Sequence, residues 1–331
     1  MQFKLNRVMQ MTAAMFAVGA LAACGSSSND DSADNNDENT AVFSLAVSDA
    51  PVDAAERVLV CFESVQLVGN GIGSQRFEVG GENGIVEAND LCLDDSGNPI
   101  PNTHGIDLLT LQGANAESLI VGADVPAGTY GQLRLDITSG SEIELMDGTI
   151  VDLRVPSGQL RLDGPTLSAN QTFNYTLEFD LRKAVVAPPG LGHYLLTPRG
   201  LRLVDNAEVG HIDGQVAETL LLENGCEVAP ADLTTPVAAV YLYSGHDVDD
   251  ADMGDNSSDD AGPYASTAVF FDGAAQYNFE IGFVQSGAYT IAVTCDTADD
   301  PEVETELDFF HRENIEIESG VTLELVVGSP D

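Results

Sequence analysis

Alternation of apolar and polar residues with a period of two is the feature of this sequence that most constrains its fold. In the clearest stretch, Phe173, Tyr175, Leu177, Phe179 and Leu181 alternate with polar residues. Successive side chains of an extended strand point to opposite faces of a sheet. The pattern therefore predicts a strand with one buried face and one solvated face.

Similar short segments recur about every 8 to 12 residues, separated by Gly, Pro and Asn, and only residues 106–121 could hold a short helix. We expect an all-β fold of two tandem β-sandwiches. Further strands are expected at residues 42–47, 58–63, 76–79, 130–137, 150–155, 159–162 and 194–204, and then at 209–216, 237–243, 267–271, 277–283, 288–295, 314–317 and 321–327.

The N-terminus has the character of an export signal. Residues 1–23 combine Lys4 and Arg7 with a short apolar run, and Cys24 follows the sequence LAA. The apolar run is too short to span a membrane. The segment resembles the lipobox of bacterial lipoproteins, in which that Cys is lipidated and becomes the new N-terminus. Gly25, where an Asp would resemble an inner-membrane retention signal, favours the outer membrane of a Gram-negative bacterium, on either its periplasmic face or the cell surface.

The remainder divides into three parts by composition. Residues 24–40 are acidic and carry no large apolar side chain, so we expect a disordered tether. We place a first β-sandwich at residues 41–206 and a second at 207–331, where Arg312 is the one basic residue.

The net charge restricts the classes of partner. The sequence contains 54 acidic and 12 basic residues, for a formal charge of −42. Such a field repels phosphate backbones and anionic bilayers, so we expect no nucleic-acid partner and attachment to a membrane only through the lipid on Cys24. Hydrophobic residues make up 44% of the chain, which is enough for packed cores.

Four cysteines remain besides Cys24. An even number of cysteines in an exported chain indicates disulfides. Three pairings are possible, but the domain division places two cysteines in each half. We therefore predict the bridges Cys61–Cys92 and Cys226–Cys295. None of these cysteines has the close spacing of a zinc site.

Several phrases together resemble a known family. They are SDAP at 48–51, DLLTLQG at 107–113, PAGTYGQLRL at 126–135, FDLRKAVVAPPG at 179–190 and LRLVDNAEVGHIDGQV at 201–216. Residues 41–206 are similar to an exported bacterial family, number 4382 among the domains of unknown function. The later phrases GHIDGQV, VYLY and SGAYTIAVTC more weakly resemble transthyretin-like or carboxypeptidase-regulatory-like sandwiches, which are generally accessory modules. Neither resemblance implies a catalytic residue.

No common catalytic motif is present in the sequence. His104 with Asp107 could be a base and its orienting group, or chance neighbours. Glu142 with Glu144 could be a pair of glycosidase carboxylates, or part of a solvated acidic face. Gly69 with Gly71 and Gly73 could be a phosphate-binding loop, or a hairpin turn.

Seven aspartates crowd into residues 247–260, where they would repel one another unless a cation or salt screened them. A calcium site is one hypothesis, and a solvated or salt-adapted loop is the other. The spacing is not that of an EF-hand, and we expect no other cofactor. The tentative calcium ligands are Asp247, Asp249, Asp250, Asp252 and Asp255, and Asp259 and Asp260 complete the acidic loop.

A repeated phrase places Arg134, Arg161 and Arg202 in similar surroundings, GQLRL twice and GLRL once. These arginines could clamp a carboxylate or sulfate. They could equally neutralise neighbouring acids.

From these features we expect a lipid-anchored, non-catalytic envelope protein that serves in binding or scaffolding, with an unknown protein, glycan or cation as its ligand. One alternative is an envelope hydrolase of polysaccharide or peptide whose active site carries no familiar motif. Another is a purely structural component of the envelope.

Overall fold

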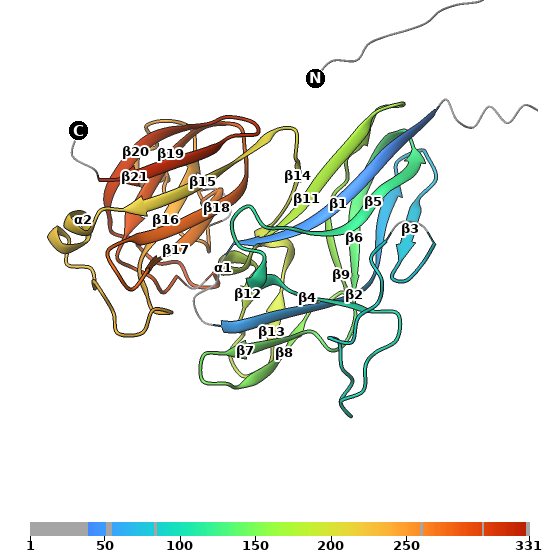
Figure 1. Cartoon of the computed structure of the whole chain (residues 1–331), viewed down its shortest axis with the longest axis horizontal. Coiled ribbons are helices and arrows are strands. Elements are labelled where there is room, and N and C mark those ends of the chain that lie inside the picture. Colours follow the sequence, from blue (N-terminus) through green and yellow to red (C-terminus); the bar gives the residue numbers. More distant parts are fainter. Residues whose placement is uncertain (1–38, 51–54, 83–84, 259–260, 300, 329–331) are drawn as a thin grey trace, which may run out of the picture. The chain divides into compact units, whose positions relative to one another are not determined.

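The computed structural model describes residues 39–50, 55–82, 85–258, 261–299 and 301–328, and its fold is all-β, as predicted (Figure 1). The predicted signal peptide, Cys24 and the tether up to residue 38 lie outside the described residues. Within the described ranges, no helix is both long enough and apolar enough to cross a bilayer.

Residues 40–205 form a β-sandwich of two sheets. The first sheet has four strands in the order β14-β11-β1-β5, and the second has ten. The first contains β1 (Thr40–Ala50), β5 (Glu117–Pro126), β11 (Thr172–Asp180) and β14 (Leu201–Asp205). The second contains β2 (Ala55–Gly69), β3 (Gln75–Glu78), β4 (His104–Asp107), β6 (Gly128–Ile137), β7 (Glu142–Leu145), β8 (Ile150–Arg154), β9 (Gln159–Asp163), β10 (Thr166–Leu167), β12 (Val185–Val186) and β13 (Tyr194–Leu196).

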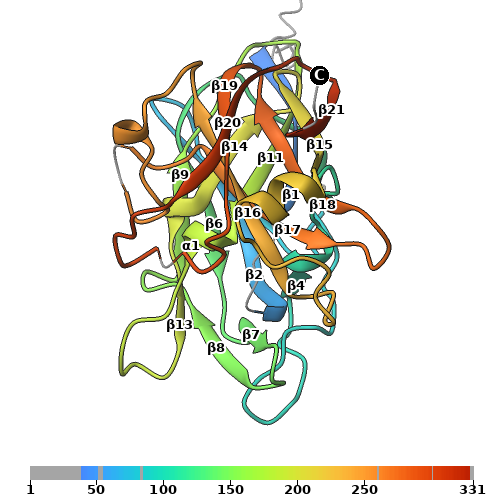
Figure 2. The same ribbon diagram turned by 90° about the vertical axis from the view of Figure 1, so that its left-hand side faces the viewer.

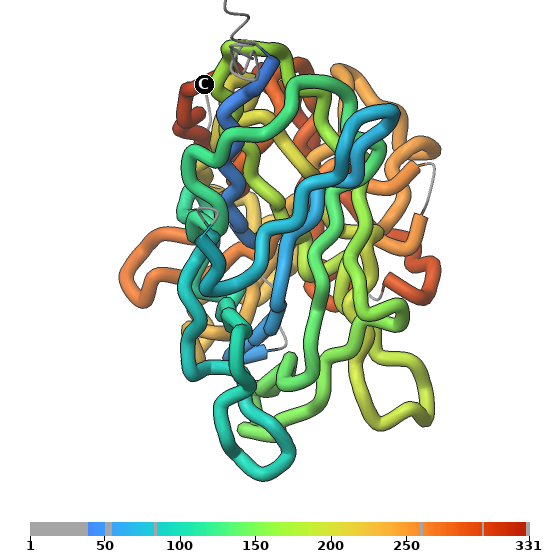
Figure 3. The backbone as a smooth tube through the Cα atoms, turned by 90° about the vertical axis from the view of Figure 1, so that its right-hand side faces the viewer, coloured from blue at the N-terminus to red at the C-terminus, as the bar shows by residue number. Residues whose placement is uncertain are grey.

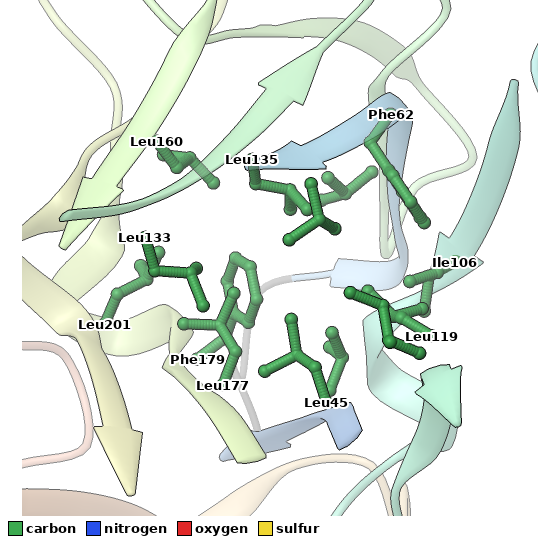
Figure 4. Packing of buried hydrophobic residues seen from close by; sticks show 14 of the residues in the cluster. Leu45, Phe62, Ile106, Leu119, Leu133, Leu135, Leu160, Leu177, Phe179 and Leu201 are labelled. Atoms are coloured by element: carbon green, nitrogen blue, oxygen red, sulfur yellow. The ribbon is translucent and has the colours of Figure 1, made fainter. Parts of the chain in front are cut away.

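The core of this sandwich lies between the two sheets and is built from alternate residues of each strand. Every second side chain of β1 enters it, from Phe43 to Val47, while the residues between them face away. Figure 4 shows side chains of both sheets pointing toward one another. They include Leu45, Leu177 and Phe179 from the four-stranded sheet and Phe62, Leu133 and Leu135 from the ten-stranded sheet.

The four-stranded sheet joins distant parts of the chain. β1 pairs in parallel with β11, so that Phe43 lies opposite Phe173 and Val47 opposite Leu177. On its other side β1 pairs antiparallel with β5. Parallel partners require a long crossover connection, which here contains most of the ten-stranded sheet.

Residues 209–327 form one seven-stranded sheet in the order β20-β19-β16-β17-β18-β15-β21 (Figure 2). Its side chains from Ile212 to Val327 make a second core, and β15 also contacts β20 across that core. The sheet therefore curls around its own apolar side. Its strands are β15 (Val209–Val216), β16 (Pro236–Ser244), β17 (Ala265–Phe271), β18 (Tyr277–Gln285), β19 (Gly287–Thr294), β20 (Phe309–Ile317) and β21 (Thr322–Val327).

Both predicted disulfides are present. Cys61 on β2 is bonded to Cys92 in the loop between β3 and β4, and Cys226 is bonded to Cys295 after β19. The first bridge lies in a small buried cluster with Leu59.

Two local predictions are wrong. Residues 106–121 hold one 3-10 turn, η2 (Leu108–Thr110), rather than an α-helix, because Asp107 caps that turn and the segment from Glu117 pairs with β1. Residues 194–204 form two strands, because Pro198 starts the 3-10 turn η3 (Pro198–Gly200) between them. Two short helices, α1 (Leu181–Ala184) and α2 (Glu218–Glu223), were not expected.

Candidate functional site

The glycine run at residues 69–73 is a hairpin turn. It joins β2 to β3, which pair antiparallel, and Figure 3 shows this hairpin in blue. A Cβ on Gly69 would lie 2.1 Å from the carbonyl oxygen of Ile72, so the turn itself requires glycine there. No helix follows to present amides to a phosphate.

His104 and Asp107 do not form a catalytic pair. The buried ring of His104 has Nε2 2.7 Å from the Glu117 carboxylate and Nδ1 2.7 Å from the carbonyl oxygen of Glu87. The Asp107 carboxylate instead accepts backbone hydrogen bonds from Val58 and Leu109, each at 3.3 Å. Both groups therefore hold strand and turn geometry.

Glu142 and Glu144 also have a structural partner. Both lie on β7, and the guanidinium of Arg57 on the neighbouring β2 bridges them, with Nε 3.4 Å from Glu144 Oε2 and Nη2 bonded to Glu142. Two carboxylates that share one cation in this way are not arranged around a scissile bond.

The aspartates of the acidic loop are spread out. Asp249 and Asp252 are exposed, and Asp247 accepts a hydrogen bond of 2.8 Å from Asn314. Asp250 forms an ion pair with Arg312. Asp259 and Asp260 lie outside the described residues.

Asp255 is the exception, since only 2% of it is exposed. Its carboxylate accepts hydrogen bonds from the backbone and hydroxyl of Ser257, from Ser258 and from the backbone of Thr305. It borders an acidic hollow of about 700 Å³. In the described ranges no three His, Cys, Asp or Glu side chains lie close enough together to hold a metal, so the calcium hypothesis stays a prediction.

The predicted solvated face of β11 is wrong for its second half, where Thr176, Glu178 and Asp180 are buried. In the four-stranded sheet, Glu178 lies opposite Ser48 on β1 and Arg202 on β14. The face is covered because β1 contacts β17 and β18 of the seven-stranded sheet.

This burial perturbs both carboxyls. Loss of hydration raises the pKa of Glu178 to about 8, against the opposing effect of the Arg202 charge. Burial also raises the pKa of Asp180, which accepts a hydrogen bond of 3.3 Å from the backbone of Ser266 on β17.

Three arginines that follow β11 reach residues of the seven-stranded part. Arg182 on α1 donates to the carbonyl of Thr297 at 3.1 Å and lies 5.6 Å from the ring centre of Tyr241. Arg199 donates to the carbonyl of Ser257 at 2.6 Å. Arg202 donates to the carbonyl of Tyr264 at 2.6 Å, and its guanidinium carbon lies 4.6 Å from the centre of that ring. We call Arg182, Arg199 and Arg202 with their partners the arginine joint.

The outer face of the ten-stranded sheet carries a row of arginines. Arg161 on β9 lies directly opposite Arg134 on β6. Arg134 lies opposite Gln66 on β2, and Gln66 lies opposite Arg76 on β3. Arg76 forms an ion pair of 2.7 Å with Asp136. Among the described residues, Arg134 and Arg161 form no ion pair. Each is hydrogen-bonded to the glutamine two residues before it, at 2.8 and 2.9 Å.

A surface hollow of about 520 Å³ connects this row to the arginine joint. Arg161 and Arg202 both line it, together with Gln132, Tyr264 and Gln285. Nε and Nη2 of Arg202 are buried and have no acceptor among the described residues. Two arginines of the repeated phrase, Arg161 and Arg202, thus line one place, which we call the arginine hollow, and Arg134 lies opposite Arg161 outside this lining.

Sequence reasoning missed Glu178, Asp180, Arg182 and Arg199. For the first three, the only signal was that charged residues recur through the phrase EFDLRK at 178–183, between Phe179 and Leu181. That pattern does not distinguish a solvated face from one covered by a later part of the chain. Arg199 lies outside this phrase and had no such signal.

Comparisons with known proteins give a family but no activity. A search of curated proteins finds no match. Two crystal structures described as putative adhesins show a slight likeness. The first, from Bacteroides ovatus ATCC 8483, has 10% identity and a TM-score of 0.19, with 95% of this chain and 99% of that chain covered. The second, from Bacteroides ovatus, has 9% identity and a TM-score of 0.16, with coverage of 88% and 89%.

Structural similarity at TM-scores this low is no basis for assigning a fold or a function to this chain. Residues 40–198, by contrast, match the model of a protein family, and they include β1 and β11 as well as Arg134 and Arg161. This part of the chain belongs to the family called Domain of unknown function (DUF4382).

Proposed function

We propose that this protein is a lipid-anchored, non-catalytic component of the cell envelope that binds a ligand on its β-sandwich surface, the ligand being a glycan or a protein. The observation that carries the proposal is the arginine hollow. In a chain with 54 acidic and 12 basic residues, Arg161 lines a cavity without an ion pair among the described residues, and Arg134, opposite it on the neighbouring strand, also lacks one there. Groups left available in this way are typical of a binding surface.

The surroundings of the other candidate residues support a non-catalytic role. His104, Glu142 and Glu144 each have close partners that hold them in structural contacts. A general base needs a free position toward its substrate, which these contacts occupy.

The anchor is tested by replacing Cys24 with Ser and following the protein in cell fractions. We expect the wild-type chain to incorporate a labelled fatty acid and to sediment with outer membranes, and C24S to lose both properties. Cys61→Ser, which leaves the lipobox intact, is the control for effects on folding. A C24S protein that still carries the label would disprove the anchor.

The binding role is tested with purified full-length protein and a panel of acidic and neutral polysaccharides. We expect at least one polysaccharide to be retained on the immobilised protein with no new reducing ends released during prolonged incubation. Release of reducing ends that increases with protein concentration would favour the alternative, an envelope hydrolase.

A further inference from the structure

We propose that the arginine hollow is a binding site for an oxyanion, the carboxylate or sulfate group of an acidic ligand, held between Arg161 and Arg202 with Arg134 beside it. The inference rests on the proposed binding function, whose ligand class it specifies. It does not depend on the lipid anchor.

The first support is energetic. Arg134 and Arg161 are directly opposed in an antiparallel pair of strands, where Cβ atoms lie about 5 Å apart and like charges destabilise the sheet. In so acidic a chain, a nearby carboxylate would be the simplest compensation, as Arg57 and Arg76 obtain. The two arginines instead have glutamine partners, which carry no charge. A bound anion would compensate both charges.

The second support is geometric. The guanidinium group presents N–H donors in a planar fork that matches a carboxylate or sulfate. Nε and Nη2 of Arg202 are buried and lack a hydrogen-bond acceptor in the described part of the chain, although the charge of Arg202 also attracts the buried carboxyls of Glu178 and Asp180. The hollow has about 520 Å³, which is in the size range of small-molecule sites. Tyr264 and Gln285 add an aromatic ring and an amide to its wall.

The overall charge of −42 does not prevent such binding. At physiological salt the screening length is about 8 Å, so the nearest charges dominate. One acidic residue, Asp163, lines the arginine hollow, whereas five line the acidic hollow: Asp250, Asp255, Glu304, Glu306 and Asp308. Two arginines and one aspartate therefore line the arginine hollow, whereas the acidic hollow is lined, in the described ranges, by carboxylates without a basic residue.

The test is titration calorimetry of the purified full-length protein with sodium sulfate, galacturonate and oligogalacturonate. Arg161→Gln removes one charge from an exposed side chain whose partner is a glutamine of its own strand, so the fold is retained. We expect R161Q to weaken binding of these probes at least tenfold. Arg154→Gln, which removes an exposed arginine paired with Asp152 outside the hollow, should change the affinity for these probes less than twofold.

The probes distinguish the source of the oxyanion. Oligogalacturonate bound at least tenfold more tightly than galacturonate, at equal carboxylate concentration, would assign the site to an acidic glycan. Equal affinities would assign it to free small anions. Absence of binding by the wild-type protein, or binding unchanged in R161Q, would overturn the inference.

Thermal stability gives a second readout. Because R161Q removes the opposed like charges, we expect its Tm in low salt to be about 1 to 3 °C above that of wild type. Sulfate should then raise the Tm of wild type more than that of R161Q, and an equal rise would contradict a bound anion. If these experiments fail while the polysaccharide panel still shows retention without hydrolysis, only the oxyanion site is wrong; release of reducing ends would instead refute the proposed function.

Discussion

At the scale of single residues, the carboxyl of Glu178 has an environment very different from water. It is fully buried, with Ser48 and Arg202 on the neighbouring strands and Asp180 on its own strand. Loss of hydration exceeds the attraction of Arg202, so its pKa rises to about 8. The side chain therefore titrates near neutral pH, unlike an exposed glutamate.

Replacing Glu178 with Gln should change how stability depends on pH. The folded pKa of about 8 lies above the ordinary 4.5, so the carboxyl favours folding fully below about pH 4.5 and loses that contribution as the pH rises through 8. Relative to wild type, E178Q should gain roughly 1.4 kcal/mol of unfolding free energy per pH unit between about pH 5 and 8. Urea denaturation across this range measures the difference.

Glu324→Gln, on an exposed position of β21, is the matched control and should run parallel to wild type. A constant difference between E178Q and wild type from pH 5 to 8 would mean that Glu178 does not titrate there.

At the scale of elements, the disulfides close loops of different length, with sequence separations of 31 residues for Cys61–Cys92 and 69 for Cys226–Cys295. Loop-closure entropy predicts losses of about 3.7 and about 4.4 kcal/mol on removal of the first and second bridge. Chemical denaturation of the Cys61→Ala/Cys92→Ala and Cys226→Ala/Cys295→Ala proteins measures both. A loss below 1 kcal/mol for either pair would show that its loop is already constrained by packing.

Elements defined by local pattern could be predicted, and elements defined by distant contacts could not. The strand at Val209–Val216 matches its prediction because its periodicity and turns lie within the strand itself. The burial of Glu178 depends on β17 and β18, about 90 to 100 residues later, so nothing near Glu178 in the sequence indicates it. For the same reason the repeated arginines were recognised, while the meeting of Arg161 and Arg202 at one hollow was not.

At the scale of the whole molecule, the described residues from 39 onward belong to one compact unit, and the arginine joint connects its two cores. The hydrogen bonds run from Arg182, just after β11, from Arg199 in η3 and from Arg202 on β14 to backbone carbonyls in the seven-stranded part. Tyr241, whose pKa is raised by burial, stays protonated and donates to Asp299 at 2.7 Å. The contacts of the arginine joint are thus hydrogen bonds between polar groups, which depend on the orientation of donor and acceptor.

Breaking the joint should separate the unfolding of the two cores. Arg182 is only 5% exposed, so Arg182→Ala leaves the carbonyl of Thr297 and the hydroxyl of Tyr241 without this donor, at a cost of about 1 to 3 kcal/mol. We expect one calorimetric transition for wild type and two for R182A combined with R199A. Arg154→Ala, an exposed arginine outside the joint, should keep one transition. Two transitions in wild type would show that the joint does not couple the cores.

The parallel pairing of β1 with β11 also has a kinetic consequence. Phe43 cannot pair with Phe173 until the intervening chain has been synthesised and ordered. Contacts between residues so far apart in sequence make folding slow. During that delay the apolar side of β1 would be open to aggregation, so the newly made polypeptide should need a holding chaperone.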